Sequence, residues 1–99
     1  MKKILFVLAK QDFRDEEYFI PKDILEKEFE VKIASNGDKG EIALGFLGGE
    51  AKIDLNIKDV NVDDYSVIIF VGGAGALKNL DNEDSYRIIK EAVQKNKLL

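Results

Sequence analysis

Two strongly apolar runs constrain the fold of this 99-residue chain more than any other feature. They cover residues 4–8 and residues 67–71, and neither contains a polar side chain. Such runs are typical of strands that are buried on both faces of a parallel sheet. The first run leads into an acidic loop at residues 11–17, and the second leads into a glycine loop at residues 72–76. In α/β folds the loops that follow parallel strands carry the active site, so we expect these two loops to form it.

A helix is predicted over residues 17–29, because apolar side chains recur there at helical spacing. We expect its buried face to consist of Ile20, Pro21, Ile24, Leu25 and Phe29. Proline has no backbone N–H and belongs in or near the first turn, so the helix should begin close to Glu16 or Glu17. Asp15 is then a candidate cap.

The middle of the chain reads as a strand at residues 30–35 and a short hairpin with arms at residues 41–46 and 51–57. Apolar and polar residues alternate in the second arm, which indicates a strand at an edge or an excursion from the main sheet. A final helix should begin at Asp81 or Asn82. Its predicted apolar stripe consists of Tyr86, Ile88, Ile89, Ala92 and Val93.

This order of elements predicts the α/β class: a flavodoxin-like, doubly wound, mainly parallel sheet with a short β-hairpin excursion. The run of strands looks incomplete at the C-terminus. A sheet cut after residues 67–71 would keep an unpaired edge, so we expect an intimate partner.

Charge and composition exclude several classes of function. The net charge of −4 and the scattered lysines argue against nucleic-acid binding. The chain contains no cysteine and no histidine, so it carries no disulfide, no thiolate metal site and no cysteine nucleophile. The apolar run after Met1, Lys2 and Lys3 is too short for a signal peptide, and no run is long enough to cross a bilayer. We therefore expect a cytoplasmic protein without membrane contact.

The two loops allow more than one interpretation. An acidic residue at a helix start, such as Glu17, is favoured by the helix dipole without any catalytic role. Glycines at 72 and 73 permit a tight turn, but they can also direct amide N–H groups at a developing oxyanion. A phosphate cradle is disfavoured because the glycine spacing and the lysine of such loops are absent. A metal site at the acidic loop is disfavoured by the absence of histidine. Three aromatic residues are candidates for a pocket wall, a core or an oligomer contact: Phe13, Tyr18 and Phe46.

Three segments resemble the ThiJ/PfpI family, which includes intracellular PfpI-like proteases. The first is Asp-Phe-Arg-Asp followed by Glu-Glu-Tyr-Phe-Ile-Pro, and the second is Ile-Ile-Phe-Val-Gly-Gly-Ala-Gly-Ala at residues 68–76. The third is the hairpin end, Lys-Ile-Asp-Leu-Asn-Ile-Lys-Asp-Val. Val71 stands where the family usually has proline. The resemblance covers the whole chain but little more than half of a family domain, so residues 1–99 correspond to the N-terminal part of one domain.

The resemblance implies a cysteine-dependent hydrolase, either a peptidase or an enzyme that processes aldehydes or their adducts. Glu17 would be the acidic partner of the cysteine, and Gly73 and Ala74 would be the oxyanion donors. The cysteine would lie in a C-terminal part, supplied as a complementary fragment or chain. The family also implies self-association into a homo-oligomer and no cofactor. The alternative is a non-catalytic binding or regulatory member of the same fold.

Overall fold

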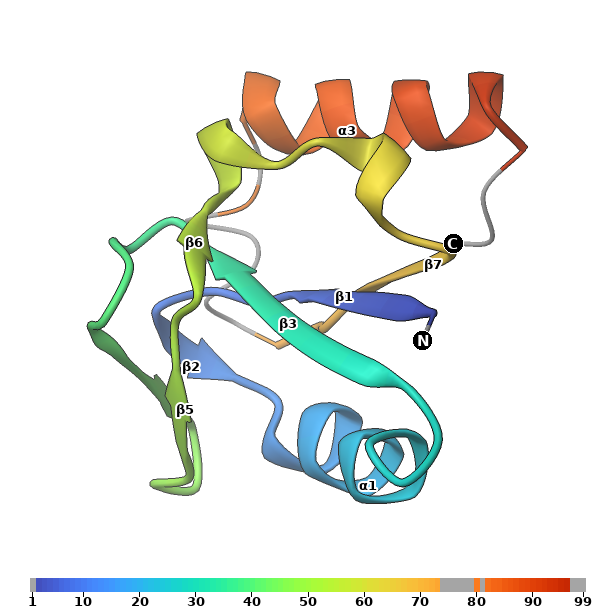
Figure 1. Cartoon of the computed structure of the whole chain (residues 1–99). Helices are drawn as coiled ribbons and strands as arrows, with labels where there is room; N and C mark the ends of the chain where they lie inside the picture. The colour runs from blue at the N-terminus through green and yellow to red at the C-terminus, as the bar shows by residue number, and fades with distance from the viewer. Residues whose placement is uncertain (1, 74–79, 81, 97–99) are drawn as a thin grey trace.

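The computed structural model describes residues 2–73, 80 and 82–96. A four-stranded parallel sheet lies at its centre, in the order β6-β3-β1-β7 (Figure 1). The central strand β1 (Lys3–Val7) pairs with β3 (Glu30–Ser35) on one side and with β7 (Val67–Phe70) on the other. A short strand, β6 (Leu55–Asn56), extends the sheet beyond β3. The first apolar run of the sequence has thus become an interior strand of the sheet, with a neighbour on each side, as β3 also has.

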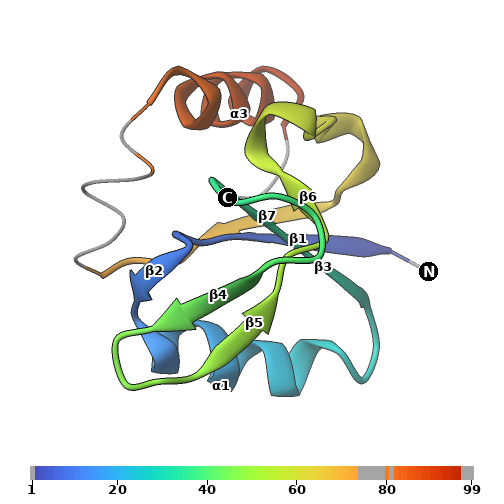
Figure 2. The same ribbon diagram turned by 90° about the vertical axis from the view of Figure 1, so that its left-hand side faces the viewer.

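Two helices cover opposite faces of this sheet. Helix α1 (Asp15–Leu25) lies on one face and α3 (Glu83–Gln94) on the other (Figures 1 and 2). Alternate residues of β1 enter two separate core clusters, because successive side chains of a strand point to opposite faces. Leu5 and Val7 pack in the cluster beside α3, whereas Ile4 and Phe6 pack in the cluster beside α1. The doubly wound α/β architecture predicted from the sequence is confirmed.

The predicted hairpin excursion is also present, as a second sheet of three strands. Its order is β2 (Gln11–Phe13), β4 (Ile42–Gly45) and β5 (Glu50–Lys52). Strands β4 and β5 are antiparallel, and β2 joins β4 in parallel. The predicted second arm is too long, because the chain leaves the hairpin after β5 and returns to the main sheet as β6. Two short 3₁₀ turns, η1 (Ile57–Asp59) and η2 (Val62–Asp64), then lead to β7.

The predicted buried face of α1 is correct only in part, because Leu25 and Phe29 are partly buried against the core cluster on that side of the sheet. Ile20 and Ile24 are 61% and 65% exposed, whereas Tyr18 is 1% exposed. The Tyr18 ring packs edge-on against Phe6 and Phe13, with ring centroids 5.3 and 5.7 Å apart. These aromatic partners come from β1 and β2, so the neighbours of the helix determine which face turns inward. The helix also begins at Asp15, and its N-cap is Arg14, which makes no side-chain capping bond.

The predicted start of α3 is correct, but its apolar stripe is only partly buried. The Asn82 side chain accepts a hydrogen bond from the Ser85 N–H at 2.9 Å, while Asp81 lies outside the described residues. Ser85, Ile88 and Ala92 form the buried face. The other predicted members of the stripe are exposed: Tyr86, Ile89 and Val93. Within the described residues, neither helix combines the length and apolar character that a bilayer span requires.

The contrast between Tyr18 and Ile24 gives a direct test of the α1 orientation. Tyr18→Ala removes a buried ring from three aromatic contacts, with Phe6, Phe13 and Phe19, and should lower the free energy of unfolding by about 3–5 kcal/mol. Ile24→Ala, the matched truncation on the exposed face, should change it by no more than about 0.5 kcal/mol. Urea denaturation measures both. A larger loss for Ile24→Ala than for Tyr18→Ala would show that the helix packs by the other face.

Candidate functional site

The acidic loop and the glycine loop meet at the carboxyl ends of β1 and β7. The backbone N–H of Val71 donates to the carbonyl of Val7 at 2.9 Å, which continues the pairing beyond the last residue of β7. The backbone N–H of Arg14 then donates to the carbonyl of Gly72, also at 2.9 Å. Because parallel strands end at the same edge of the sheet, loops far apart in the sequence are seated against each other there.

Glu17 reaches across this junction from the first turn of α1. Its Oε1 atom accepts the Gly72 N–H at 2.9 Å, a contact between residues 55 positions apart in the sequence. Its Oε2 atom accepts Nη1 of Arg14 at 3.2 Å. The sequence placed Glu17 beside the glycine turn, and the geometry brings the two together. The Arg14 contact and the part played by the Gly72 amide were not anticipated.

Gly73 occupies a position that suits only glycine. Its φ of +123° lies in a region that other residues rarely adopt. A Cβ atom there would lie 2.7 Å from the Asp12 carbonyl oxygen and 2.8 Å from the Arg14 nitrogen. Among the described residues, no acceptor is bonded to the Gly73 N–H. Ala74, the second expected oxyanion donor, lies outside the described residues.

Asp15 binds the tip of the hairpin to the head of α1, a role that the sequence did not reveal. Its carboxylate accepts the Leu47 N–H at 2.8 Å and the Gly49 N–H at 2.9 Å. The bond from Leu47, joined by that from Gly49, outweighs the effect of burial and lowers the pKa of Asp15. A Cβ on Gly45 would collide with this carboxylate, so the hairpin needs glycine there. Asp15 is therefore neither the helix cap nor a solvated acid.

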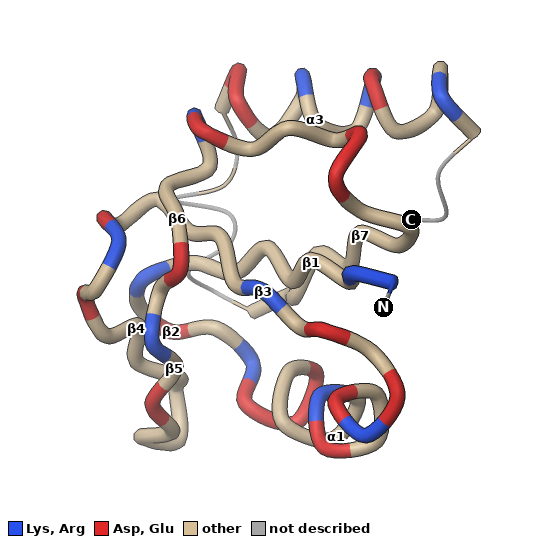
Figure 3. Tube along the Cα trace, viewed as in Figure 1, with Lys and Arg blue, Asp and Glu red and all other residues tan. Residues whose placement is uncertain are grey.

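A pocket of about 360 Å³ lies beside the junction. Its wall combines charged groups from the acidic loop with two exposed apolar side chains of the hairpin tip, and it is lined by Asp12, Arg14, Glu16, Phe46, Leu47 and Gly73. Figure 3 shows how one basic residue precedes a run of acidic ones where β2 leads into α1. Of the three candidate aromatic residues, Phe46 lines this pocket, whereas Phe13 and Tyr18 belong to the core.

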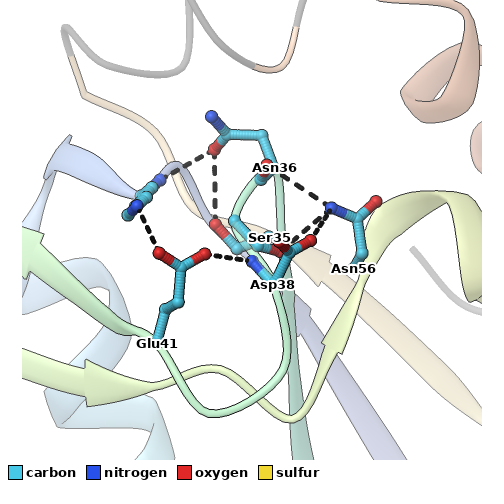
Figure 4. Close-up of polar contacts among 7 residues, drawn as sticks. Ser35, Asn36, Asp38, Glu41 and Asn56 are labelled. Atoms are coloured by element: carbon cyan, nitrogen blue, oxygen red, sulfur yellow. Dashed lines mark hydrogen bonds and ion pairs between the residues drawn. The ribbon is translucent and has the colours of Figure 1, made fainter.

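A second polar cluster lies at the carboxyl end of β3, where it stabilises the loop before the hairpin (Figure 4). Lys10 Nζ contacts Glu41 at 2.7 Å, and this hydrogen bond lowers the pKa of Glu41. The Asn36 side chain accepts the Lys10 N–H at 2.8 Å, and Asn56 Nδ2 donates to the Gly37 carbonyl at 3.0 Å. These groups are partners of one another, which is the pattern of a structural network. In the described part of the chain, no three acidic residues are grouped as metal ligands.

The Asp15 contacts predict a specific pH dependence of stability. A folded-state pKa below the unfolded value gives stability that is present above the unfolded value, about 3.9, and that is lost as pH falls through the folded value. Asp15→Asn should therefore lower the urea midpoint of unfolding at pH 7. The midpoint of this variant should also decrease less than that of the unmodified chain as the pH is lowered. Asp23→Asn, an exposed acid on the same helix, should leave both properties nearly unchanged. If the urea midpoint of Asp15→Asn fell with decreasing pH as steeply as that of the unmodified chain, this assignment would be contradicted.

Gly73 can be tested against a glycine of similar backbone conformation. Gly73→Ala should destabilise the chain by about 1–3 kcal/mol from backbone strain, with an added cost from its close contacts. Gly48 has a φ of +90° but open space around the Cβ position, so Gly48→Ala should show the strain alone. Equal midpoints for the two variants in urea denaturation would show that the junction tolerates a side chain.

Comparison with known proteins gives the family of the chain. Residues 2–99 match the sequence model of the DJ-1/PfpI family. An uncharacterised protein of Methanocaldococcus jannaschii is 40% identical over an alignment of 99 positions that covers 98% of this chain and 47% of that protein. Deglycase PfpI of Pyrococcus furiosus is 34% identical over 96 residues, 96% of this chain and 56% of the relative.

The crystal structure of a ThiJ/PfpI domain protein from Brachyspira murdochii superposes with a TM-score of 0.89 at 33% identity. The match covers 96% of this chain and 54% of that structure. The chain thus spans about half the length of the relatives it matches. The resemblance first suggested by the acidic and glycine loops is confirmed, and the chain belongs to the DJ-1/PfpI family.

Proposed function

We propose that this chain forms the acidic half of the active site of a cysteine-dependent hydrolase, a peptidase or an enzyme that acts on reactive aldehydes or their adducts. The observation that carries the proposal is the 2.9 Å bond from the Gly72 N–H to Glu17 Oε1, beside the turn in which Gly73 has a positive φ. This bond places the Glu17 carboxyl, the proposed proton-transfer group, next to the glycine turn whose backbone amides are the proposed oxyanion donors. The similarity to a protein named a deglycase supports the second of these activities, the processing of aldehyde adducts.

Each group has a separate task in the proposed reaction. Glu17 exchanges a proton with a neighbouring thiol, so that a thiolate is available to attack the substrate carbonyl. The amides of Gly73 and Ala74 stabilise the oxyanion that forms when the carbonyl becomes tetrahedral. The N–H of Gly73, which has no acceptor among the described residues, is suited to this task. The proposal requires no cofactor.

The sulfur has to come from outside this sequence, because the chain contains no cysteine. We propose that a complementary C-terminal segment or chain supplies it, and that residues 1–99 form the N-terminal part of one domain. Within the described residues, β7 pairs only with β1 and leaves its other edge open. This edge is a suitable place for a further strand. We further propose a cytoplasmic location and association into a homo-oligomer.

A second candidate is a non-catalytic binding or regulatory member of the family. It is favoured by one observation, the absence of both cysteine and histidine from all 99 residues. Such a protein would use the pocket beside Gly73 to bind a partner or a small molecule. A complementation experiment separates the two candidates.

The experiment combines this chain with the part of the Pyrococcus furiosus relative that lies beyond the matched region. We expect a complex on size-exclusion chromatography that hydrolyses an aldehyde adduct of an amino acid. Glu17→Gln should lower kcat/KM by about a hundredfold or more, the usual effect of removing a proton-transfer group. Glu26→Gln, at the other end of the same helix, should leave kcat/KM within about twofold.

Two results would count against the enzyme. Equal activity of the Glu17→Gln and Glu26→Gln complexes would remove Glu17 from the reaction. A stable complex without hydrolysis would favour the non-catalytic candidate. Failure of the two parts to associate would contradict the proposed partner.

A further inference from the structure

Arg14 makes two separate connections at the site. Its backbone N–H donates to the carbonyl of Gly72 at 2.9 Å, which joins the two loops. Its guanidinium Nη1 donates to Glu17 Oε2 at 3.2 Å, while the other oxygen of the same carboxylate accepts the Gly72 N–H. Arg14, Gly72 and Glu17 therefore form a closed ring of hydrogen bonds, in which each carboxylate oxygen has one partner.

We propose that the Arg14 guanidinium is a positioning residue that holds the Glu17 carboxylate against the Gly72 amide. This inference rests on the proposed function for its catalytic meaning, but the contact itself can be tested without any cysteine. The side chain and the backbone of Arg14 would have different tasks. The backbone bond closes the loop junction, and the guanidinium sets the direction of the carboxylate.

The charges around the site explain why a cation is needed there. Among the described residues, Arg14 is the one positively charged residue that lines the pocket, and the other charged wall residues are Asp12 and Glu16. Its Nε atom also lies 3.8 Å from Glu16 Oε1. Without the guanidinium, Glu17 would face like charges from the same loop and would gain by turning toward water.

The exposure of the Arg14 and Glu17 side chains, 56% and 41%, limits what this ion pair contributes to folding. Exposed pairs add little to global stability. The same exposure leaves the guanidinium accessible from the pocket, where its charge also favours the anionic form of an approaching thiol. The expected effect is therefore on the geometry and reactivity of the site and not on the stability of the fold.

The first test uses this chain alone and follows hydrogen exchange of the Gly72 amide by NMR. Arg14→Gln keeps the backbone bond and removes the cation, so exchange at Gly72 should become about two- to fivefold faster. Arg14→Lys should restore part of the protection. Lys22→Gln removes a cation that pairs with Glu26 elsewhere on α1, and it should leave Gly72 unchanged. Exchange of the buried Phe6 amide should be the same in all variants.

A double-mutant cycle shows whether the effect passes through the carboxylate. In a Glu17→Gln background, Arg14→Gln should no longer change Gly72 exchange. Unaltered exchange in the Arg14→Gln single variant would overturn the proposal. An effect of the same size in the Glu17→Gln background would also overturn it, because Arg14 would then act through another group.

A second readout connects the contact with the chemistry. In the complemented protein described above, Arg14→Gln should move the pH profile of thiol alkylation toward higher pH, and Lys22→Gln should not. A profile that stays in place would restrict Arg14 to a structural role and overturn the catalytic part of the inference. If Gly72 exchange responds to Arg14 but Glu17→Gln leaves hydrolysis intact, the positioning contact is real and the proposed function fails.

Discussion

The structure of the site depends on one backbone hydrogen bond, from the Arg14 N–H to the Gly72 carbonyl. This bond fixes the acidic loop on the glycine turn, and the bare Cα of Gly73 lets the two backbones approach closely. Glu17 can reach the Gly72 amide only because this approach has been made. A carboxylate, a glycine turn and a pocket wall are thereby assembled from loops that follow two neighbouring strands of the sheet.

The hairpin formed by β4 and β5 contributes a further wall of the pocket. The Asp15 carboxylate binds two amides of the hairpin tip, and the same tip presents Phe46 and Leu47 to the pocket. Consecutive acidic residues at the head of α1 thus have different tasks. Asp15 holds the apolar wall, Glu16 contributes charge to the pocket, and Glu17 contacts the glycine turn. A short acidic run that resembles a solvated helix start is in fact divided among three different partners.

The sequence predicted the strands far better than the side-chain partners. Strands buried on both faces have unbroken apolar runs, so β1 and β7 were evident, and the Asn82 cap marked α3. The burial of Tyr18 on α1 was not evident, because its ring packs against Phe6 of β1 and Phe13 of β2, which lie elsewhere in the sequence. The role of Asp15 was hidden for the same reason, since its acceptor oxygens meet backbone amides more than 30 positions away that carry no residue-specific signal. Glu17 was found through the family resemblance and not through periodicity.

The central place of β1 has a consequence for biosynthesis. Ile4 pairs with Val67 as well as with Val31, and these two partners lie far apart in the sequence. During synthesis β1 therefore acquires its second neighbour only after β7 has been translated, and one edge of this apolar strand stays unpaired until then. Sheets whose strands pair over such long sequence separations fold slowly, and their exposed apolar surface and unpaired edges promote aggregation until folding is complete.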